Sequence, residues 1–353
     1  MQAIWMTKRG GTAVLEVRET PDPFPAANEV RVRVRSAGLN FADVIARSGL
    51  YPAAPPPPCI LGYEIAGGID QVGSGVRNFT PGERVVALTP FGGHADAVCV
   101  AAPRVLKLPD NVSFDTAAAI PVNYLTALHM VGRVAGIHPG DTVLLHAAGG
   151  GVGLAVLNLC RMIGGVRVFG TASAAKHAVL REHGCDFPID YRTQDYAEEV
   201  MRHTGGKGVD VVFDPLGGAD WKRGYKLLKP AGRLVAYGFS NLQTGRRGNL
   251  LRMVEQLARM PWFTPLKLMQ DNRSIAGVSL ADMWGEPLMD DLRKVIGLCA
   301  EGKIVPAIDA RFPFSKVAEA HQRLEQRKNV GKVLLIPDVW MERMAGNLNL
   351  PVA

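Results

Sequence analysis

The stretch Thr142-Val143-Leu144-Leu145-His146-Ala147-Ala148-Gly149-Gly150-Gly151-Val152-Gly153 decides how the middle of this chain folds. Its first four residues predict a buried strand, and the apolar run from Val152 to Ile163 predicts a helix. Glycines between them let backbone N–H groups and the helix N-terminus approach a pyrophosphate. Ala148 replaces the first glycine of the usual pattern, which a tight turn tolerates. Glycines alone are weak evidence, but this context predicts a dinucleotide site at Gly150, Gly151, Val152 and Gly153.

Strands and helices continue to alternate beyond this turn. We expect strands at Val166–Phe169, around Ile189, and at Val209–Phe213, Arg233–Tyr237 and Ser274–Val278. Helices are expected at Ala174–His183, Asp195–His203 and Gly218–Leu228. Such alternation implies a parallel sheet with helices on both faces. The segment 241–273 is longer than a simple loop and is interpreted as an insertion.

The first 120 residues indicate a different, β-rich domain. Charged and Val residues alternate from Glu29 to Arg35, as in a half-buried strand, and Gly and Pro recur at short intervals afterwards. After expected helices at Asp290–Ala300 and Ser315–Arg327, a strand at Gly331–Ile336 should return to this domain, because the sheet of the middle domain is already complete. The remainder, Met341 to Ala353, is expected to be a loosely ordered tail.

The residues that follow the second strand of the middle domain indicate which dinucleotide is bound. NAD-binding folds usually place Asp or Glu there, about 20 residues past the glycines, to hold the ribose 2′-hydroxyl. Here the sequence is Gly170-Thr171-Ala172-Ser173-Ala174-Ala175-Lys176, which has hydroxyls and a lysine but no acid. This favours NADP(H), with Thr171, Ser173 and Lys176 near the 2′-phosphate. Tyr191 and Arg192 are expected to flank the adenine.

Bulk properties exclude several classes of protein. The net charge of +7 comes from scattered Lys and Arg, without the dense basic and aromatic stripe of a nucleic-acid-binding protein. The N-terminus lacks the apolar core of a signal peptide, and no apolar run is long enough to span a bilayer. The five cysteines are far apart, which suits reduced thiols and a cytoplasmic location.

Several segments together resemble a known family. They include Ala37-Gly38-Leu39-Asn40-Phe41-Ala42-Asp43, Gly62-Tyr63-Glu64, the glycine turn and Asn329-Val330-Gly331-Lys332. The chain resembles the medium-chain dehydrogenase/reductase superfamily in its quinone oxidoreductase branch, and is most like the vesicle amine transport protein subgroup. This resemblance implies a GroES-like β-barrel domain, 1–123 and 284–353, that binds substrate. It also implies a Rossmann domain, 124–283, that binds NADP(H).

The resemblance also raises the question of zinc, because the superfamily contains zinc alcohol dehydrogenases. The positions that match their catalytic ligands are Asn40, Tyr63 and, less directly, Ala119. Zinc takes thiolate, imidazole or carboxylate ligands, and none of these three side chains provides one. We therefore expect no metal. Without this Lewis acid, alcohol oxidation loses its means of stabilising an alkoxide.

Hydride addition to a quinone or an α,β-unsaturated carbonyl needs only hydrogen-bond donors for the oxygen that becomes negative. The catalytic candidates are Asn40, Tyr51 and Tyr63, with Asn123 and Thr126 as further donors. A tyrosine on a strand is more often a packed core residue, and solvent can supply the proton. The resemblance places Asn40 and Thr126 beside the nicotinamide. It assigns Gly238, Phe239, Ser240, Arg327 and Asn329 to cofactor contacts as well.

Glu64 stands in an apolar, glycine-rich run, Leu61 to Gly68, where an unpaired carboxylate is costly. We expect it to be a buried anchor that pairs with Lys332 or with backbone donors. His146, just before the glycines, is interpreted as structural.

The sequence therefore predicts a zinc-independent, NADPH-dependent reductase of quinones or enones. The alternatives are a pathway-specific enoyl reductase and a low-turnover NADPH-binding protein that acts in membrane or partner interactions. The insertion predicts a basic amphipathic helix with Leu250, Val254, Leu257 and Ala258 on one face. Residues 246–268 are thus a candidate lid, subunit contact or peripheral membrane contact. A homodimer is expected through an exposed edge at Ser274–Val278.

Overall fold

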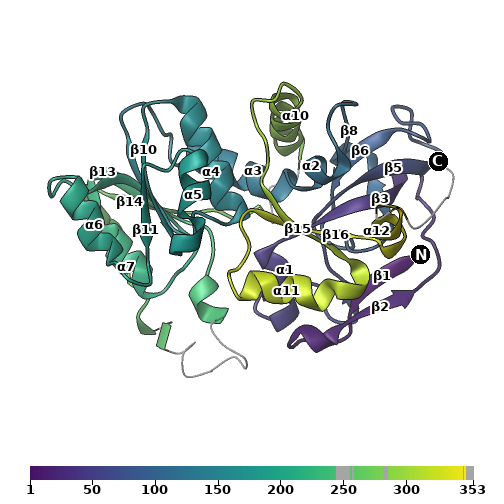
Figure 1. Ribbon diagram of the computed structural model, residues 1–353, viewed down its shortest axis with the longest axis horizontal. Helices are drawn as coiled ribbons and strands as arrows, with labels where there is room; N and C mark the ends of the chain where they lie inside the picture. The colour runs from purple at the N-terminus through teal and green to yellow at the C-terminus, as the bar shows by residue number, and fades with distance from the viewer. Residues whose placement is uncertain (244–254, 257, 281–284, 345, 347–353) are drawn as a thin grey trace. The chain divides into compact units, whose positions relative to one another are not determined.

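The structure, a computed structural model, describes residues 1–243, 255–256, 258–280, 285–344 and 346. The chain forms two compact units (Figure 1). One consists of Met1–Leu125 with Ala281–Ala353, and is called the split unit here; the other, the central unit, is Thr126–Leu280.

The central unit is built on a parallel six-stranded sheet in the order β11-β10-β9-β12-β13-β14. Its strands are β9 (Thr142–Leu145), β10 (Arg167–Ala172), β11 (Phe187–Asp190), β12 (Val209–Asp214), β13 (Leu228–Ala236) and β14 (Ser274–Gly277). Its helices are η3 (His129–Val134), α4 (Gly151–Ile163), η4 (Ala174–Lys176), α5 (His177–Glu182), α6 (Tyr196–His203), α7 (Ala219–Lys226), η5 (Ser240–Gln243) and α9 (Pro265–Asp271).

The central sheet is buried on both faces. All four residues of β9 are buried, as a strand covered on both faces requires. Helices cover both faces of the sheet, with α4 and α5 on one side and α6 and α7 on the other (Figure 1). The doubly wound fold expected from the sequence is confirmed. Strand β14 is the last strand of this sheet among the described residues, and the homodimer stays a prediction.

The split unit contains a seven-stranded and a three-stranded sheet. The larger has the order β15-β16-β3-β5-β6-β8, with β7 paired to β3; the smaller is β2-β1-β4. Its strands are β1 (Gln2–Met6), β2 (Leu15–Glu19), β3 (Glu29–Leu39), β4 (Cys59–Ile60), β5 (Glu64–Val72), β6 (Arg84–Leu88), β7 (Ala97–Ala101), β8 (Val105–Lys107), β15 (Ile308–Pro313) and β16 (Lys332–Ile336).

Short helices connect and cover these sheets. They are η1 (Thr12–Val14), α1 (Phe41–Ser48), η2 (Ala102–Arg104), α2 (Phe114–Ala118), α10 (Glu286–Ala300), η6 (Phe314–Lys316), α11 (Val317–Glu325) and α12 (Asp338–Met344). Helix α3 (Pro121–Leu128) begins in this unit and ends in the central one. The pairing of β16 with β3, in which Val333 faces Leu39, confirms that the last strand returns to the N-terminal sheet.

One expectation about the C-terminus is wrong. A loose tail was expected from Met341 to Ala353, but Met341 to Met344 belong to helix α12. Residues 345 and 347–353 lie outside the described residues. The physical reason is a long-range contact that the polar composition hid: the Arg35 guanidinium lies 3.2 Å from the centre of the Trp340 ring.

The insertion is described only in part. Leu250, Val254 and Leu257 of the predicted amphipathic face lie outside the described residues. After them, Trp262 is 96% exposed, and Leu266 and Met269 on α9 are 59% and 71% exposed. Among the described residues, no helix has the length and apolar content that crossing a bilayer requires.

Candidate functional site

The glycine turn connects β9 to α4 as a closed loop. Ala147 has a left-handed backbone (φ 52°), and its carbonyl accepts a hydrogen bond of 2.9 Å from Gly150 N. Gly150 precedes the first turn of α4, whose backbone N–H groups have no partners inside the helix. A Cβ on Gly153 would lie 2.5 Å from the Ala148 carbonyl oxygen, so only glycine lets the helix start this close to the loop. The turn therefore has the geometry of an anion-binding helix N-terminus.

A buried pair of side chains holds this turn in place. The Thr171 hydroxyl lies 3.1 Å from His146 Nδ1 and accepts a hydrogen bond of 3.3 Å from Ala147 N. Ala148 N donates to the Thr171 carbonyl at 3.1 Å. Burial lowers the pKa of His146, which keeps its ring neutral. Thr171, predicted from sequence to face a phosphate, thus uses its hydroxyl to brace the loop.

The end of β10 carries the two other predicted phosphate contacts. Ser173 precedes η4 with extended backbone and no side-chain cap to that helix. A Cβ on Gly149 would lie 2.7 Å from Lys176 Cδ, so the Lys176 side chain runs directly over the glycine turn. The structure thus brings Lys176 against the turn, as expected from its place after the second strand of the middle domain.

The remaining predicted cofactor residues of the central unit lie at the carboxyl ends of its strands or on α3. Tyr191 follows β11, is 42% exposed, and has the Arg192 guanidinium 6.0 Å from its ring centre. Gly238, Phe239 and Ser240 follow β13, where Ser240 N donates to the Pro215 carbonyl at 2.8 Å. Thr126 lies on α3 and is partly buried. Ligands of open α/β sheets bind at this end of the strands.

In the split unit, Asn40 forms a buried cluster with Glu64 and Lys332. Asn40 Nδ2 donates to Glu64 Oε1 at 2.7 Å, and Lys332 Nζ donates to Asn40 Oδ1 at 2.7 Å. Lys332 also forms an ion pair with Glu64. The second carboxylate oxygen of Glu64 accepts a hydrogen bond of 2.7 Å from Val122 N, in the first turn of α3. The expectation that Glu64 is anchored by Lys332 and a backbone donor is confirmed.

Gly38 and Asp43 also shape this cluster, and neither was predicted from the sequence to be a site residue. A Cβ on Gly38 would lie 2.4 Å from Glu64 Oε1, so glycine is required for the carboxylate to lie against β3. Asp43 accepts hydrogen bonds from Asn40 N at 2.8 Å and Gly62 N at 3.1 Å. Burial raises the pKa of Asp43 to about 7 against the effect of these donors. Asn40 and Asp43 have the spacing of a helix capping box, so their contact could have been predicted from the sequence.

Tyr51 and Tyr63, the other catalytic candidates, lie together in an aromatic group with Phe91. The Tyr63 ring centre is 6.3 Å from Tyr51 and 5.0 Å from Phe91. The Tyr63 hydroxyl is buried and makes no hydrogen bond of normal geometry among the described residues. Burial, the nearby Asp43 and Tyr51 raise the pKa of Tyr63 above the usual range, so the hydroxyl keeps its proton and can donate a hydrogen bond.

The last two predicted cofactor residues lie in the loop between α11 and β16. Arg327 is exposed and has a left-handed backbone (φ 54°). Asn329 is buried and donates from Nδ2 to the Gly331 carbonyl at 2.9 Å, which fixes the loop before Lys332.

Known proteins match this chain along most of its length. Residues 26–110 match the family model of the alcohol dehydrogenase GroES-like domain, and residues 183–335 match the one described as zinc-binding dehydrogenase. Synaptic vesicle membrane protein VAT-1 homolog of Mus musculus is 42% identical over 341 residues, which cover 96% of this chain and 84% of that protein. The chain is a medium-chain dehydrogenase/reductase.

Two further relatives place it within this superfamily. A quinone oxidoreductase of Pseudomonas aeruginosa is 36% identical over 330 residues, covering 93% of this chain and 97% of the relative. The crystal structure of Escherichia coli quinone oxidoreductase complexed with NADPH superposes with a TM-score of 0.85 at 32% identity, covering 96% and 100% of the two chains. This medium-chain dehydrogenase/reductase thus belongs to the quinone oxidoreductase branch and its vesicle amine transport protein subgroup.

One matching family model is described as zinc-binding, so we compared the side chains at the zinc-ligand positions with the ligands that zinc requires. The amide of Asn40 is occupied by Glu64 and Lys332, the Tyr63 hydroxyl stays protonated, and Ala119 has no donor atom. This donor set does not fit zinc. Within the described part of the chain, no three His, Cys, Asp or Glu side chains are placed to hold a metal ion. Zinc independence itself stays a prediction.

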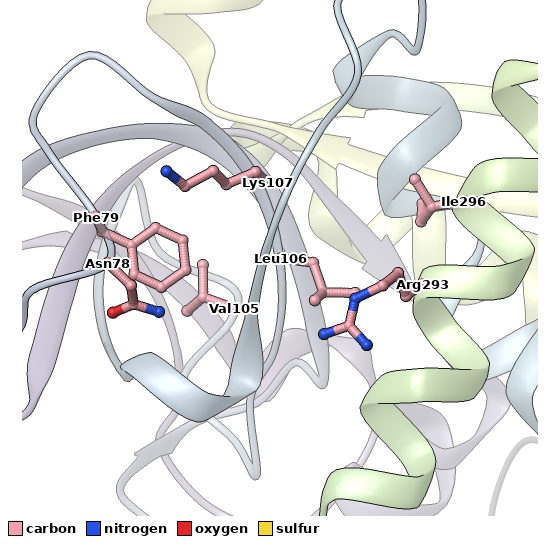
Figure 2. Close-up of a pocket in the computed structure, with 7 residues that line it drawn as sticks. All are labelled: Asn78, Phe79, Val105, Leu106, Lys107, Arg293 and Ile296. Atoms are coloured by element: carbon pink, nitrogen blue, oxygen red, sulfur yellow. The ribbon is translucent and has the colours of Figure 1, made fainter.

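A separate hollow of about 360 Å³ lies on the split unit (Figure 2). Figure 2 shows that its charged side chains, Lys107 and Arg293, come from β8 and α10. They already form ion pairs with Glu83 and Asp290. The other lining residues are Asn78, Phe79, Val105, Leu106 and Ile296. No predicted site residue lies among them, and we assign this hollow no part in the reaction.

Proposed function

We propose that this chain is a zinc-independent, NADPH-dependent oxidoreductase that transfers hydride to quinones or α,β-unsaturated carbonyls. The observation that carries the proposal is the buried cluster at Asn40. Where zinc relatives have a metal ligand, this chain has a carboxamide held by Lys332 and Glu64. A hydrogen-bond donor suits an acceptor that is already electron-poor, and a simple alcohol or ketone would need a Lewis acid.

The choice of NADPH rests on the end of β10. No carboxylate follows the strand to bind a ribose 2′-hydroxyl, and the aliphatic part of the Lys176 side chain lies against Gly149 of the turn. Thr171 and His146 brace the turn, and Ser173, which follows β10, is proposed to offer its hydroxyl to the 2′-phosphate. The bound NADPH of the E. coli relative supports the same assignment.

We assign the split unit to the acceptor and the central unit to the cofactor. NADPH, when bound, supplies hydride to an electron-poor carbon of the acceptor, and the acceptor's oxygen gains negative charge before a solvent proton completes the reduction. Asn40 is proposed to donate its remaining N–H to that oxygen. The protonated Tyr63 hydroxyl is a second donor, with Tyr51 next to it. We propose that the cofactor is also contacted by Gly238, Phe239, Ser240, Tyr191, Thr126, Arg327 and Asn329.

A second candidate function has one observation in its favour. Trp262, Leu266 and Met269 expose apolar side chains at the end of the insertion, as a protein that contacts a membrane or a partner would. In this alternative the chain binds NADPH with little turnover.

NADPH oxidation against a panel of quinones and enones separates the two functions, with cofactor affinity measured in parallel. The proposal expects turnover with at least one acceptor class and a lower Kd for NADPH than for NADH. Tight NADPH binding without turnover above background would favour the second candidate. Tighter binding of NADH would overturn the roles given to Ser173 and Lys176.

A further inference from the structure

Both ends of the Asn40 carboxamide are held by charged, buried partners. Lys332 Nζ donates to Oδ1 at 2.7 Å, and Nδ2 donates to Glu64 Oε1 at 2.7 Å. Asn40, Glu64 and Lys332 are 6%, 0% and 2% exposed. Because all three side chains are buried, these contacts decide how the amide is oriented.

The chemistry of the two partners allows only one orientation. An ammonium group only donates hydrogen bonds, and a carboxylate only accepts them. Rotating the amide by 180° would place its N–H groups against the ammonium and its oxygen against the carboxylate. Such buried, unsatisfied contacts are strongly unfavourable. Lys332 and Glu64 together therefore fix which side of Asn40 carries the donor.

The fold brings these three residues together from distant parts of the sequence. Asn40 directly follows β3 and Lys332 begins β16, and these strands pair so that Leu39 faces Val333. Glu64 begins β5, on the other side of β3, where Ile65 faces Ala37. Asn40 is thus held from both neighbouring strands of one sheet.

We propose that Lys332 is a positioning residue for hydride transfer: with Glu64, it locks the Asn40 amide so that the second Nδ2 hydrogen is presented to the acceptor's oxygen. This inference rests on the proposed function. One Nδ2 hydrogen is used by Glu64, and the other has no partner among the described residues. A donor fixed before the reaction stabilises developing charge without having to reorient.

The direct test is the paired variant Lys332→Met/Glu64→Gln, since Lys332→Met alone would leave a buried carboxylate without its cation. In the pair, the oxygen of the amide introduced at position 64 accepts from Val122 N. Its NH₂ group then donates toward Asn40, which favours the inverted Asn40 orientation. The single-turnover rate of NADPH oxidation at saturating acceptor should fall about 100-fold. The Kd of NADPH and the KM of the acceptor should stay within about threefold.

Two sets of controls separate positioning from general damage. Arg31→Met/Asp70→Asn removes another ion pair of the same unit, in which Arg31 Nη2 lies 2.8 Å from Asp70 Oδ2, and should leave the hydride step unchanged. Asn40→Ala should slow the hydride step as much as the paired variant, and the triple variant should be no slower than Asn40→Ala. A wild-type hydride rate in the paired variant would overturn the inference, and so would multiplicative losses in the triple variant.

A readout without turnover keeps this inference distinguishable from the proposed function. NMR of protein labelled with ¹⁵N-asparagine should show one Asn40 Nδ2 hydrogen that is shifted downfield by its bond to the Glu64 carboxylate and protected from exchange with water, and this pattern should be lost in the paired variant. If wild-type protein reduces no acceptor, the proposed function fails and the NMR result still decides whether the amide is locked. Asn40 Nδ2 hydrogens in wild-type protein that show no downfield shift and exchange with water as fast as those of an exposed asparagine would refute the lock.

Discussion

Gly153→Ala tests whether the glycine turn binds the cofactor as its geometry requires. A Cβ at this position would lie 2.5 Å from the Ala148 carbonyl oxygen and 2.6 Å from that of Ala147. Real Cβ contacts are essentially never below 3.0 Å, so α4 and the loop must separate. Overpacking of this kind costs about 1–3 kcal/mol. The Ala147 carbonyl also closes the turn through Gly150 N, so the shift moves the N–H groups that are proposed to bind a phosphate of the cofactor.

The loss in affinity follows from the hydrogen bonds that are misplaced. A hydrogen bond to a charged group contributes about 1.5–3 kcal/mol, so losing one should raise the Kd of NADPH by about 10- to 150-fold. Fluorescence titration with NADPH measures this change, and urea unfolding measures any loss of stability.

Gly132→Ala is the matched control in the same unit, because a Cβ there has no neighbour within 4 Å. It should leave NADPH affinity unchanged. The reasoning is refuted if Gly153→Ala binds NADPH within about twofold of wild type. Equal weakening in both variants would refute it too.

Three further predictions concern other residues. Lys176→Ala should raise the Kd of NADPH about tenfold and leave that of NADH nearly unchanged in parallel titrations, because only the 2′-phosphate loses a charge partner; equal effects would contradict the assignment. The pKa of Asp43 is raised by burial from 3.8 to about 7, so the stability it gives is complete below about pH 4 and is lost as pH rises through 7. Urea unfolding between pH 5 and 8 should show this slope in wild type, and a slope that persists in Asp43→Asn would assign it to another group. Tyr63→Phe removes a buried hydroxyl that has no hydrogen bond of normal geometry to any described residue, so stability should be kept, while kcat should fall about tenfold at unchanged NADPH affinity; an unchanged kcat would make Tyr63 a packing residue.

The fold of the central unit was predictable because its signals are local. Buried strands, a glycine turn and apolar helices follow one another within short windows of sequence, and period alone separates them. The partner of Glu64 could also be anticipated, since a carboxylate in an apolar run needs a cation and Lys332 stands in a matching motif. These inferences depend on residue type alone and do not require knowing how the strands are aligned with one another.

What the sequence could not give depends on contacts between distant segments. The lock on Asn40 needs the register of β3 against both β5 and β16, and the passage of Glu64 over Gly38 needs the same register. Thr171 shows the limit clearly: its place at the end of a strand indicated a phosphate contact, but its hydroxyl braces Ala147 instead. Local pattern cannot show which of two nearby partners a hydroxyl takes.

The central claim is metal-independent hydride transfer from NADPH to an electron-poor acceptor. The most direct measurement uses NADPH deuterated at the transferring position of C4, with EDTA-treated protein whose zinc content has been determined, and an enone whose product is analysed by mass spectrometry. We predict one deuterium on the β-carbon of the product, formed at the same rate before and after EDTA treatment. Product without the label, or activity that EDTA abolishes and zinc restores, would contradict the account.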